Sequence, residues 1–521
     1  MLVRLRAAAA GLRLRLPRYR GLVLGDVKIP VQRLSNANLR ALPVDVRRPT
    51  YDRGTQRTGI VHFGIGAFHR AHQAVYTDDA MAAGDRDWAI SGVSLRSPDV
   101  RDALQPQDGL YSVTERGSAG ERLRVIGSVR EVLVGSEDAE AIIAALASPH
   151  VHIATFTVTE KGYLRDPEQG SLLTTATDLA HDLHGIGAPR TIYGFLERGL
   201  IRRRAAGLPG MTLLSCDNLA SNGRQLAALL DEYLERRDPT LAQWARRENS
   251  YPCTMVDRIV PATAAADIAR TADVLGFEDR AAVMAESFSQ WVIEDRFAGP
   301  RPKWQAGGVQ FAADVRSFET AKLRMLNGAH SALAYVGLGL GLEYVHQAIA
   351  DPDLNALVRR IMEEGAATLT PAPGQDLVAY AETLEHRFVN ASLNHRLIQI
   401  AMDGTQKIPQ RWLASIATLL KAGRPPAGLL FALAGWIAFA CTPERTLDDP
   451  LAGRLAEIRE RSSDARSAVG AIVGAGGLFS GAWQADSATL ERIAAQVNAI
   501  AERGVGRALT EMLAATHPKQ P

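Results

Sequence analysis

The sequence contains few cysteines and none in a metal-binding arrangement. Its 521 residues include only three, Cys216, Cys253 and Cys441, which are far apart and odd in number. They provide neither a disulfide framework nor a CxxC pair for a metal ion. Because proteins of oxidising compartments commonly rely on disulfides, this cysteine usage predicts a reducing compartment and a cytoplasmic location.

The sequence also lacks a strong net charge outside its first 26 residues. Residues 1–26 hold six Arg and a single acid, Asp26. The remainder carries 53 basic and 56 acidic residues, a net charge of −3. This balance predicts no nucleic-acid partner.

Residues 1–26 lack the continuous apolar core of a secretory signal. We interpret them as an atypical basic tail, which is either a targeting segment or translated upstream sequence with the true start near Val27. Hydroxyl side chains typical of transit peptides are absent, which favours the second interpretation.

Long apolar runs are also scarce. The uncharged stretch PPAGLLFALAGWIAFACTP, residues 425–443, approaches the length of a membrane span, but prolines bound it and Gly and Ala dilute it. We expect a buried helix there and no membrane partner.

The order of apolar patterns predicts two domains of different architecture. Runs rich in β-branched residues alternate with helical stretches through the first part of the chain, as in a parallel sheet covered on both faces. From about residue 313 the period is helical, with few strand candidates. We therefore predict an α/β Rossmann-type domain over residues 50–312 and a mostly α-helical domain over residues 313–521.

A glycine turn in FGIGAFHRAH follows the first predicted strand and opens a helix. Gly64 permits a tight turn, and Gly66 lets the backbone approach a pyrophosphate. An acid after the second strand should bind the ribose hydroxyls, although Arg96 nearby could instead receive the 2′-phosphate of NADP. The residues predicted to bind the cofactor are Gly64, Gly66, Phe68, His69, Arg70 and Asp99.

The segment KLRMLNGAH, residues 322–330, brings polar residues together among apolar ones. On a helix with 100° per residue, Lys322, Asn327 and His330 lie on one side. Glu319, one turn earlier, joins them. A polar half-face of a surface helix would look the same, so other motifs must decide between the two interpretations.

Six motifs occur in a fixed order along the chain: GIGAFHRAHQA, TVTEKGY, SCDNLASNG, MVDRIVPAT, QWVIED and KLRMLNGAH. Together they resemble the mannitol dehydrogenase family of polyol dehydrogenases, from about Tyr51 to the C-terminus. The resemblance implies a Rossmann-type domain followed by a helical domain, NAD as cofactor, no metal ion and a small sugar or polyol substrate. A zinc alcohol dehydrogenase is disfavoured, because the chain has no HExxH or similar ligand cluster.

The resemblance also implies roles for individual residues. Lys322 is the general acid/base, which requires a pKa lowered by burial or by a neighbouring cation. Asn218 and Asn327 donate hydrogen bonds to the substrate oxygen as it gains negative charge. The remaining implied roles are orientation of the substrate or of Lys322 by His330, proton relay by Glu319, and binding of a substrate hydroxyl by Asp257.

The segment NASLNHRLIQIAMDGTQKIPQR bears on the substrate. Mannitol-type relatives have an arginine where this chain has Gln399, and the segment is most like the fructuronate reductase (mannonate oxidoreductase) branch. A sugar acid needs a cation for its carboxylate. Among Arg387, Arg396, Lys407 and Arg411, we favour Lys407 first and Arg387 second.

The sequence therefore predicts an NAD-dependent enzyme that interconverts D-mannonate and D-fructuronate, as a monomer or small homo-oligomer. The alternatives are mannitol 2-dehydrogenase or a related polyol or altronate dehydrogenase. An alternative of another class is a non-catalytic nucleotide-binding sensor, which would not need the Lys322 constellation.

Overall fold

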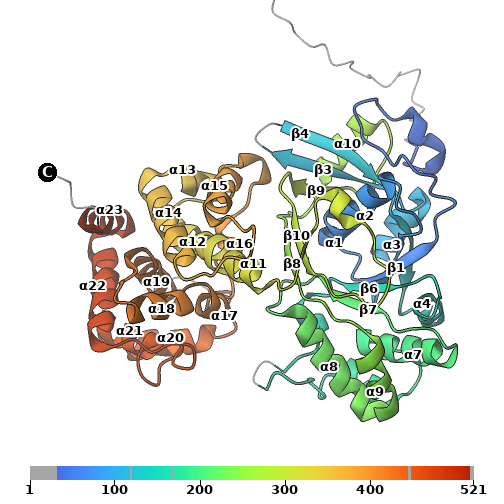
Figure 1. The fold of residues 1–521 in the computed structure, drawn as a ribbon. Coiled ribbons are helices and arrows are strands. Elements are labelled where there is room, and N and C mark those ends of the chain that lie inside the picture. The colour runs from blue at the N-terminus through green and yellow to red at the C-terminus, as the bar shows by residue number, and fades with distance from the viewer. Residues whose placement is uncertain (1–31, 118–119, 167–168, 444–446, 517–521) are drawn as a thin grey trace, which may run out of the picture.

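The computed structural model describes residues 32–117, 120–166, 169–443 and 447–516 in two units that lie side by side (Figure 1). The predicted basic tail, residues 1–26, lies outside the described residues. An α/β unit precedes a helical unit, which begins at α11 (Arg316–Ala321). The fold class predicted from the sequence is confirmed.

A five-stranded parallel sheet forms the centre of the first unit, in the order β5-β2-β1-β6-β7. Adjacent residues of its strands face opposite sides. Ile60 of β1 lies in one apolar core, and Val61 and Phe63 lie in another. Both faces are therefore covered, as the β-branched runs predict. The strands are β1 (Thr58–Phe63), β2 (Ala89–Ser94), β5 (Val129–Val134), β6 (Ile153–Phe156) and β7 (Thr212–Ser215).

Helices pack on both faces of this sheet. One core is formed mainly against α4 (Ala139–Leu146), α6 (Thr177–His184), α7 (Ile192–Ala205), α8 (Asn222–Arg237) and α9 (Pro239–Glu248). The opposite core includes α1 (Ala67–Ala71), α2 (Gln73–Ala82) and α3 (Asp99–Leu104). The first unit also contains η1 (Asn36–Ala41), η2 (Gln105–Gln107), α5 (Thr159–Gly162), α10 (Ala265–Leu275) and η3 (Trp304–Gly307).

Two small mixed sheets extend the first unit, and the sequence patterns did not predict them. One has the order β4-β3-β9 and the other β11-β10-β8. Their strands are short or carry exposed charged residues, so the alternation signal is weak. The strands are β3 (Tyr111–Gly117), β4 (Gly120–Ile126), β8 (Thr254–Asp257), β9 (Val283–Glu286), β10 (Gln290–Glu294) and β11 (Gln310–Ala312).

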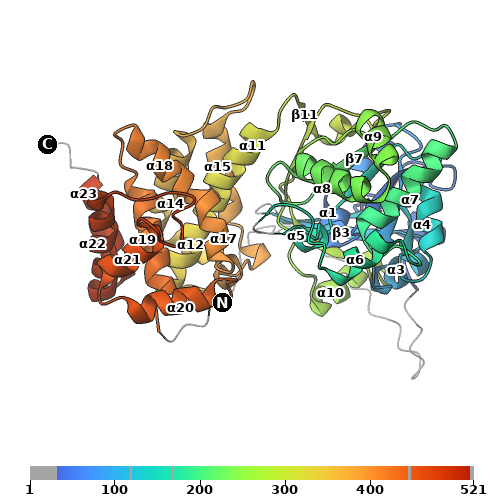
Figure 2. The same ribbon diagram turned by 90° about the horizontal axis from the view of Figure 1, so that it is seen from below.

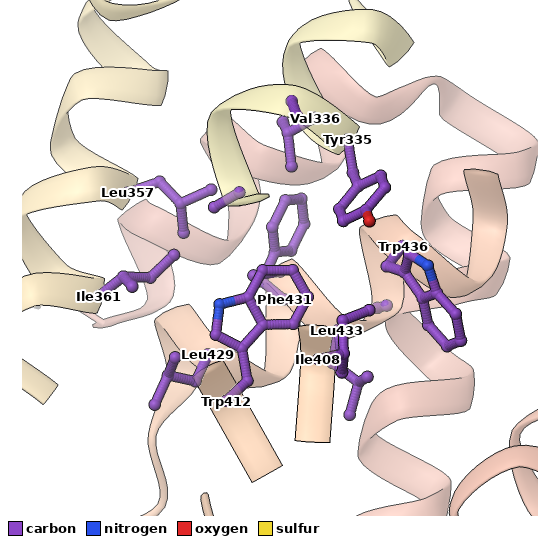
Figure 3. Close-up of a cluster of buried hydrophobic side chains, with 14 of the residues drawn as sticks. Tyr335, Val336, Leu357, Ile361, Ile408, Trp412, Leu429, Phe431, Leu433 and Trp436 are labelled. Atoms are coloured by element: carbon purple, nitrogen blue, oxygen red, sulfur yellow. The ribbon is translucent and has the colours of Figure 1, made fainter. Parts of the chain in front are cut away.

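The helical unit is built around two central helices, α12 (Gly328–Gly339) and α19 (Ala427–Ala440). Side chains of both helices, Trp436 of α19 among them, meet in the cluster of Figure 3, with Trp412 beside them. The further helices are α13 (Val345–Ala350), α14 (Pro352–Ala366), α15 (Leu377–Phe388), η5 (Ala391–Leu393), α16 (Leu397–Ile400), α17 (Gly404–Ile408), α18 (Ala414–Lys421), α20 (Ala452–Arg461), α21 (Ala465–Val473), α22 (Ser487–Arg503) and α23 (Val505–Thr516).

The uncharged stretch at 425–443 forms α19, which is buried along nearly its whole length. The prediction of a buried helix is confirmed. Within the described parts of the chain, no helix is both long enough and apolar enough to cross a bilayer.

Two π-helical turns interrupt the helical unit, η4 (Lys322–Asn327) and η6 (Pro409–Leu413), and they contact each other. The sequence predicted an ordinary α-helix at residues 322–330. Because π turns hydrogen-bond from i to i+5, they hold more residues per turn and rotate later side chains around the axis. Such turns often occur at functional sites.

Two valines on helices allow a matched test of the helical core. Val336 of α12 is fully buried in the cluster of Figure 3, whereas Val378 of α15 is 72% exposed. We expect Val336→Ala to lower the free energy of unfolding by about 2 kcal/mol, and Val378→Ala to change it by less than about 0.5 kcal/mol. Urea unfolding followed by circular dichroism measures both, and equal effects would contradict this view of the core.

Candidate active site

Three of the four predicted catalytic residues border one cavity at the boundary between the two units. The cavity has a volume of about 170 Å³. Its walls come from the chain after β6 and β7 and from β8 on one side, and from α11, η4, α17 and η6 on the other. Seen from below, α5 and α17 lie on opposite sides of this boundary (Figure 2). Lys322, Asn218, Asn327 and Glu319 all line the cavity.

Lys322 is held by two carbonyl oxygens of the first unit. Its Nζ donates hydrogen bonds to Asn218 Oδ1 at 2.9 Å and to the main-chain oxygen of Val256 at 2.7 Å. An ammonium group has three N–H donors, so one remains for a ligand. When Lys322 loses a proton, two N–H groups can stay on the carbonyl oxygens and the lone pair takes the third direction.

Burial lowers the pKa of Lys322 from its usual value of 10.5. The carboxylate of Asp257 opposes this shift, and the guanidinium groups of Arg387 and Arg411 reinforce it. A lysine with a lowered pKa can exchange a proton closer to neutral pH. The geometry is thus compatible with an acid/base role.

The two asparagines present amide groups to the same cavity. The carbonyl oxygen of Asn218 is occupied by Lys322, which leaves its NH2 group for a ligand. Asn327 also borders the cavity, and its side-chain amide has no hydrogen-bond partner among the described residues. Fixed N–H donors of this kind can stabilise an oxygen that gains negative charge.

Glu319 lies in α11, one turn before Lys322, and is half-buried. Its Oε1 accepts a hydrogen bond from the main-chain N–H of Ser221 at 2.8 Å. Burial raises the pKa of its carboxyl group. Glu319 lines the cavity, and its raised pKa brings its carboxyl group closer to the pH range in which it can exchange protons.

His330 does not line the cavity. Its side chain is buried in α12, where the ring lies 4.7 Å from that of Phe388 and 5.5 Å from that of His395. Burial lowers the pKa of this imidazole well below its usual value, and its Nε2 has no hydrogen-bond partner among the described residues. The π turn after Lys322 rotates His330 away from the position expected on a uniform α-helix.

Asp257 and Arg387, both predicted to bind substrate, bind each other. The guanidinium group of Arg387 donates to both carboxylate oxygens of Asp257, at 2.6 and 3.0 Å, and also binds Glu286. A guanidinium group with two carboxylate partners is not available to a substrate carboxylate. The prediction for Arg387 is therefore wrong, and Asp257 already has a buried partner.

Lys407 of α17 borders the cavity as predicted for a substrate-binding residue. Its Nζ donates to the main-chain oxygen of Met402 at 2.6 Å and lies 3.9 Å from a carboxylate oxygen of Asp403. Burial lowers its pKa. Whether it binds substrate remains a prediction.

Arg411 of η6 lines the cavity beside Lys407 and differs from the other candidate cations. Its Nη1 donates to Ser331 Oγ at 2.7 Å and to the main-chain oxygen of Asn327 at 3.3 Å. No carboxylate pairs with it among the described residues. Arg396, by contrast, is exposed and pairs with Glu343.

The glycine turn after β1 has the form that a dinucleotide needs. Gly64 has a φ of +93°, and a Cβ there would overlap the carbonyl oxygen of Thr157. Thr157 Oγ1 and His62 Nε2 both hydrogen-bond to the Gly64 oxygen. Gly66 is exposed, and a Cβ there would meet no atom closer than 3.8 Å. The backbone is therefore open to a phosphate group.

Two of the side chains predicted to bind the cofactor lie beneath this turn. His69 is fully buried, and its ring stacks on that of His62 with centroids 3.4 Å apart. The guanidinium group of Arg70 donates to the main-chain oxygen of Ala281. These side chains support the turn from the core, so the structure contradicts direct contact between the cofactor and His69. Phe68 is half-buried and remains a prediction.

Asp99 is exposed in the first turn of α3, five residues after the end of β2. Its predicted contact with a ribose stays a prediction. Arg96 is also exposed and pairs with Asp178 at 2.9 Å.

Asp217 is a site residue that the sequence analysis missed, although it directly precedes Asn218. Its carboxylate accepts hydrogen bonds from the main-chain N–H groups of Val158 and Thr159, and from the hydroxyl of Tyr163. Thr159 has a φ of +66°, which is unusual for a β-branched residue. Asp217 thus fixes a strained turn beside the glycine turn. Its place at a strand end was the available signal.

In the parts of the chain that the structure describes, no group of three or more His, Cys, Asp or Glu side chains could hold a metal ion. That the reaction needs no metal remains a prediction.

Comparison with known protein families identifies both units. Residues 58–306 match the Mannitol dehydrogenase Rossmann domain, and residues 314–501 match the Mannitol dehydrogenase C-terminal domain. The chain belongs to the mannitol dehydrogenase family. The resemblance noted in the sequence motifs is confirmed.

Individual members of the mannitol dehydrogenase family match along most of the chain. D-mannonate oxidoreductase of Escherichia coli (strain K12) is 40% identical over 468 residues, which are 88% of this chain and 96% of that protein. The structure of Pseudomonas fluorescens mannitol 2-dehydrogenase in a ternary complex with NAD and D-mannitol matches with a TM-score of 0.80 and 34% identity, over 92% of this chain and 99% of that one. A substrate-free D-sorbitol dehydrogenase matches with a TM-score of 0.85 and 30% identity, over 91% and 100%.

The glycine turn gives a test of the cofactor site. We expect Gly64→Ala to weaken NADH binding at least about tenfold, because alanine pays about 1–2 kcal/mol for a left-handed backbone and its Cβ overlaps Thr157. Gly84→Ala is the control, since Gly84 has a φ of +98° but open space around it. Fluorescence titration with NADH measures both, and equal affinities would contradict the assignment of the turn.

Proposed function

We propose that this protein is an NAD-dependent oxidoreductase that interconverts D-mannonate and D-fructuronate, with Lys322 as the acid/base and no metal ion. Family membership makes it a dehydrogenase that acts on a CH–OH group of a polyol or sugar acid, with NAD as cofactor. The finer choice of substrate rests on one observation. Arg411 borders the cavity as a half-buried cation that no carboxylate neutralises among the described residues.

Lys322 moves the proton of the reacting hydroxyl group. In the oxidative direction its neutral Nζ accepts that proton, and in the reductive direction its ammonium group returns it. Because Nζ is hydrogen-bonded to two carbonyl oxygens, its remaining N–H bond or lone pair points to the same place in the cavity in both protonation states. NAD, when bound, supplies the acceptor or donor of the hydride.

Asn218 and Asn327 stabilise the substrate oxygen while its charge changes. Their NH2 groups donate hydrogen bonds to that oxygen. The hydrogen bond from Lys322 to Asn218 Oδ1 already orients the amide of Asn218, so that group needs little reorganisation during the reaction. Glu319 carries the proton between Lys322 and solvent. A half-buried carboxyl group with a raised pKa suits this exchange.

Arg411 and Lys407 bind the carboxylate of the sugar acid. Burial lowers the pKa of Arg411 to about 10, because removal from water destabilises the charged guanidinium group and no carboxylate among the described residues compensates. Its Nε and Nη2 groups are free of hydrogen bonds to the described residues, and a planar guanidinium edge matches a carboxylate. The similarity to the Escherichia coli D-mannonate oxidoreductase supports the same substrate class.

A neutral polyol is the second candidate, because Glu160 and Asp403 also border the cavity. Carboxylates accept hydrogen bonds from hydroxyl groups and would suit mannitol or a similar polyol. The similarity to mannitol 2-dehydrogenases favours this alternative. A non-catalytic nucleotide sensor is disfavoured, since it has no use for the buried, doubly anchored Lys322.

A side-by-side assay separates these candidates. NADH oxidation is followed with D-fructuronate, D-tagaturonate and D-fructose, without added metal. We expect the highest kcat/KM with D-fructuronate. Preference for D-fructose would contradict the sugar-acid assignment in favour of a polyol dehydrogenase, and no turnover with any of them would favour the sensor.

Two arginines provide a matched test of the carboxylate site. We expect Arg411→Gln to lower kcat/KM for D-fructuronate about 10- to 100-fold, the cost of a lost charge-assisted hydrogen bond. Activity with D-fructose should change much less. Arg396→Gln, at an exposed ion pair, is the control and should leave both activities unchanged. Equal losses with both sugars for Arg411→Gln would rule out a role in carboxylate binding.

A further inference from the structure

A buried ion-pair network joins the two units beside the catalytic cavity. Arg387 lies in α15 of the helical unit, whereas Asp257 ends β8 and Glu286 ends β9 of the first unit. In Figure 1, α15 faces β9 and β10 across the boundary. Arg387 donates to Asp257 at 2.6 and 3.0 Å and to Glu286 at 2.8 and 3.0 Å. The three side chains are 5% exposed or less.

The network is geometrically complete without a substrate. Four of the five N–H donors of Arg387 are used, and the guanidinium group also lies 4.1 Å from the ring centroid of Phe288. Glu286 Oε1 additionally accepts a hydrogen bond from the main-chain N–H of Ile259 at 2.6 Å. Removing one member would leave another buried charge unpaired, which is costly.

The network is one residue away from an anchor of Lys322. Val256, whose carbonyl oxygen accepts the 2.7 Å hydrogen bond from Lys322, directly precedes Asp257 in β8. The position of the Asp257 side chain therefore constrains the carbonyl group that orients the amine. Two carboxylates and one guanidinium group carry a net charge of −1, which the ammonium group of Lys322 offsets.

We propose that Arg387 is a positioning residue for Lys322. Arg387 fixes β8 from the opposite unit, so the amine of Lys322 is oriented for acid/base chemistry only when the two units are in contact. The proposal rests on the role of Lys322 in the proposed function. It gives Arg387 a task different from substrate binding. The groups whose charges act on Nζ are Asp257 of β8, Arg387 of α15, Arg411 of η6 and Glu319 of α11. The imidazole of His72, between α1 and α2, is uncharged, because burial lowers its pKa to about 3.

The sign of the effect follows from these charges. Arg387 lowers the pKa of Lys322 and Asp257 raises it. Without Arg387, the carboxylate of Asp257 is free to pair with Lys322, so the protonated amine is favoured and its pKa rises. Base-catalysed oxidation then requires a higher pH.

The test compares Arg387→Met with Arg124→Met as a matched control. Arg124 is also buried and also binds two carboxylates, those of Asp78 and Asp79. It lies in β4 of the first unit and all three residues belong to that unit. We expect Arg387→Met to lower kcat about 10- to 100-fold and to shift the pH dependence of oxidation upward by about one unit. KM for NADH should stay constant. Arg124→Met should lose stability without a shift in the pH profile.

Two additions keep the proposal testable. If Arg387→Met does not fold, Arg387→Met/Glu286→Gln removes one charge of each sign, and the same upward shift is expected. Competitive acetylation of Lys322 as a function of pH, read by mass spectrometry, reports its pKa without any substrate. An inactive wild-type enzyme would then contradict the proposed function, while the acetylation profile would still decide this proposal.

An unchanged pKa of Lys322 in both Arg387 variants would overturn the proposal. The ion pairs of Arg387 with Asp257 and Glu286 would then only stabilise the contact between the two units. A loss confined to KM for sugar acids, with sugars that lack a carboxylate unaffected, would also overturn it, because Arg387 would then contact the substrate.

Discussion

The two hydrogen bonds from Lys322 Nζ, to the side chain of Asn218 and the main chain of Val256, are the interaction on which the active site depends. The amine comes from the helical unit, and both acceptors come from strand ends of the other unit. Neither unit alone orients the amine that we propose as the proton-transfer group. The active site is therefore a property of the docked pair, and the buried contact of Arg387 with Asp257 lies one residue from this anchor.

Charge is distributed unevenly around this point. Asp217, Asp257 and Glu286 have hydrogen-bonded partners that occupy them. Arg411 has none of opposite charge among the described residues, and it lies on the cavity wall next to η4. Arg411 is half-buried, and a partly desolvated cation is stabilised when an anion pairs with it. This unpaired cation is the physical basis of our proposal that the substrate carries a negative charge.

The sequence was informative wherever a signal is local. Runs such as residues 58–63 and 212–215 are apolar and β-branched, and they form strands β1 and β7. Lys322, Asn218 and Asn327 belong to motifs that could be recognised in order, Glu319 lies one helical turn before the last motif, and all four line the cavity.

The sequence was less informative about side chains whose hydrogen-bond or packing partner is distant in the chain, and where the helical period changes. Arg387 lies 130 residues from Asp257, so a single sequence offers no sign that the two charges neutralise each other. His330 does not line the cavity, because the π turn at Lys322–Asn327 departs from the 100° step of a uniform helix, and its catalytic role stays a prediction. His69 sits at a fingerprint position, but only the packing of the core shows that its ring stacks inward on His62.

The measurement that bears most directly on the central claim is the pH dependence of kcat in both directions for the wild-type enzyme and for Lys322→Ala. Oxidation needs the neutral amine and should rise as pH increases through the pKa of Lys322. Reduction needs the ammonium form and should fall through the same pKa, which lies below 10.5 because the group is buried. Lys322→Ala should lose both dependences and orders of magnitude in kcat while still binding NADH. Wild-type rates in this variant, or pH dependences that survive the substitution, would contradict Lys322 as the acid/base.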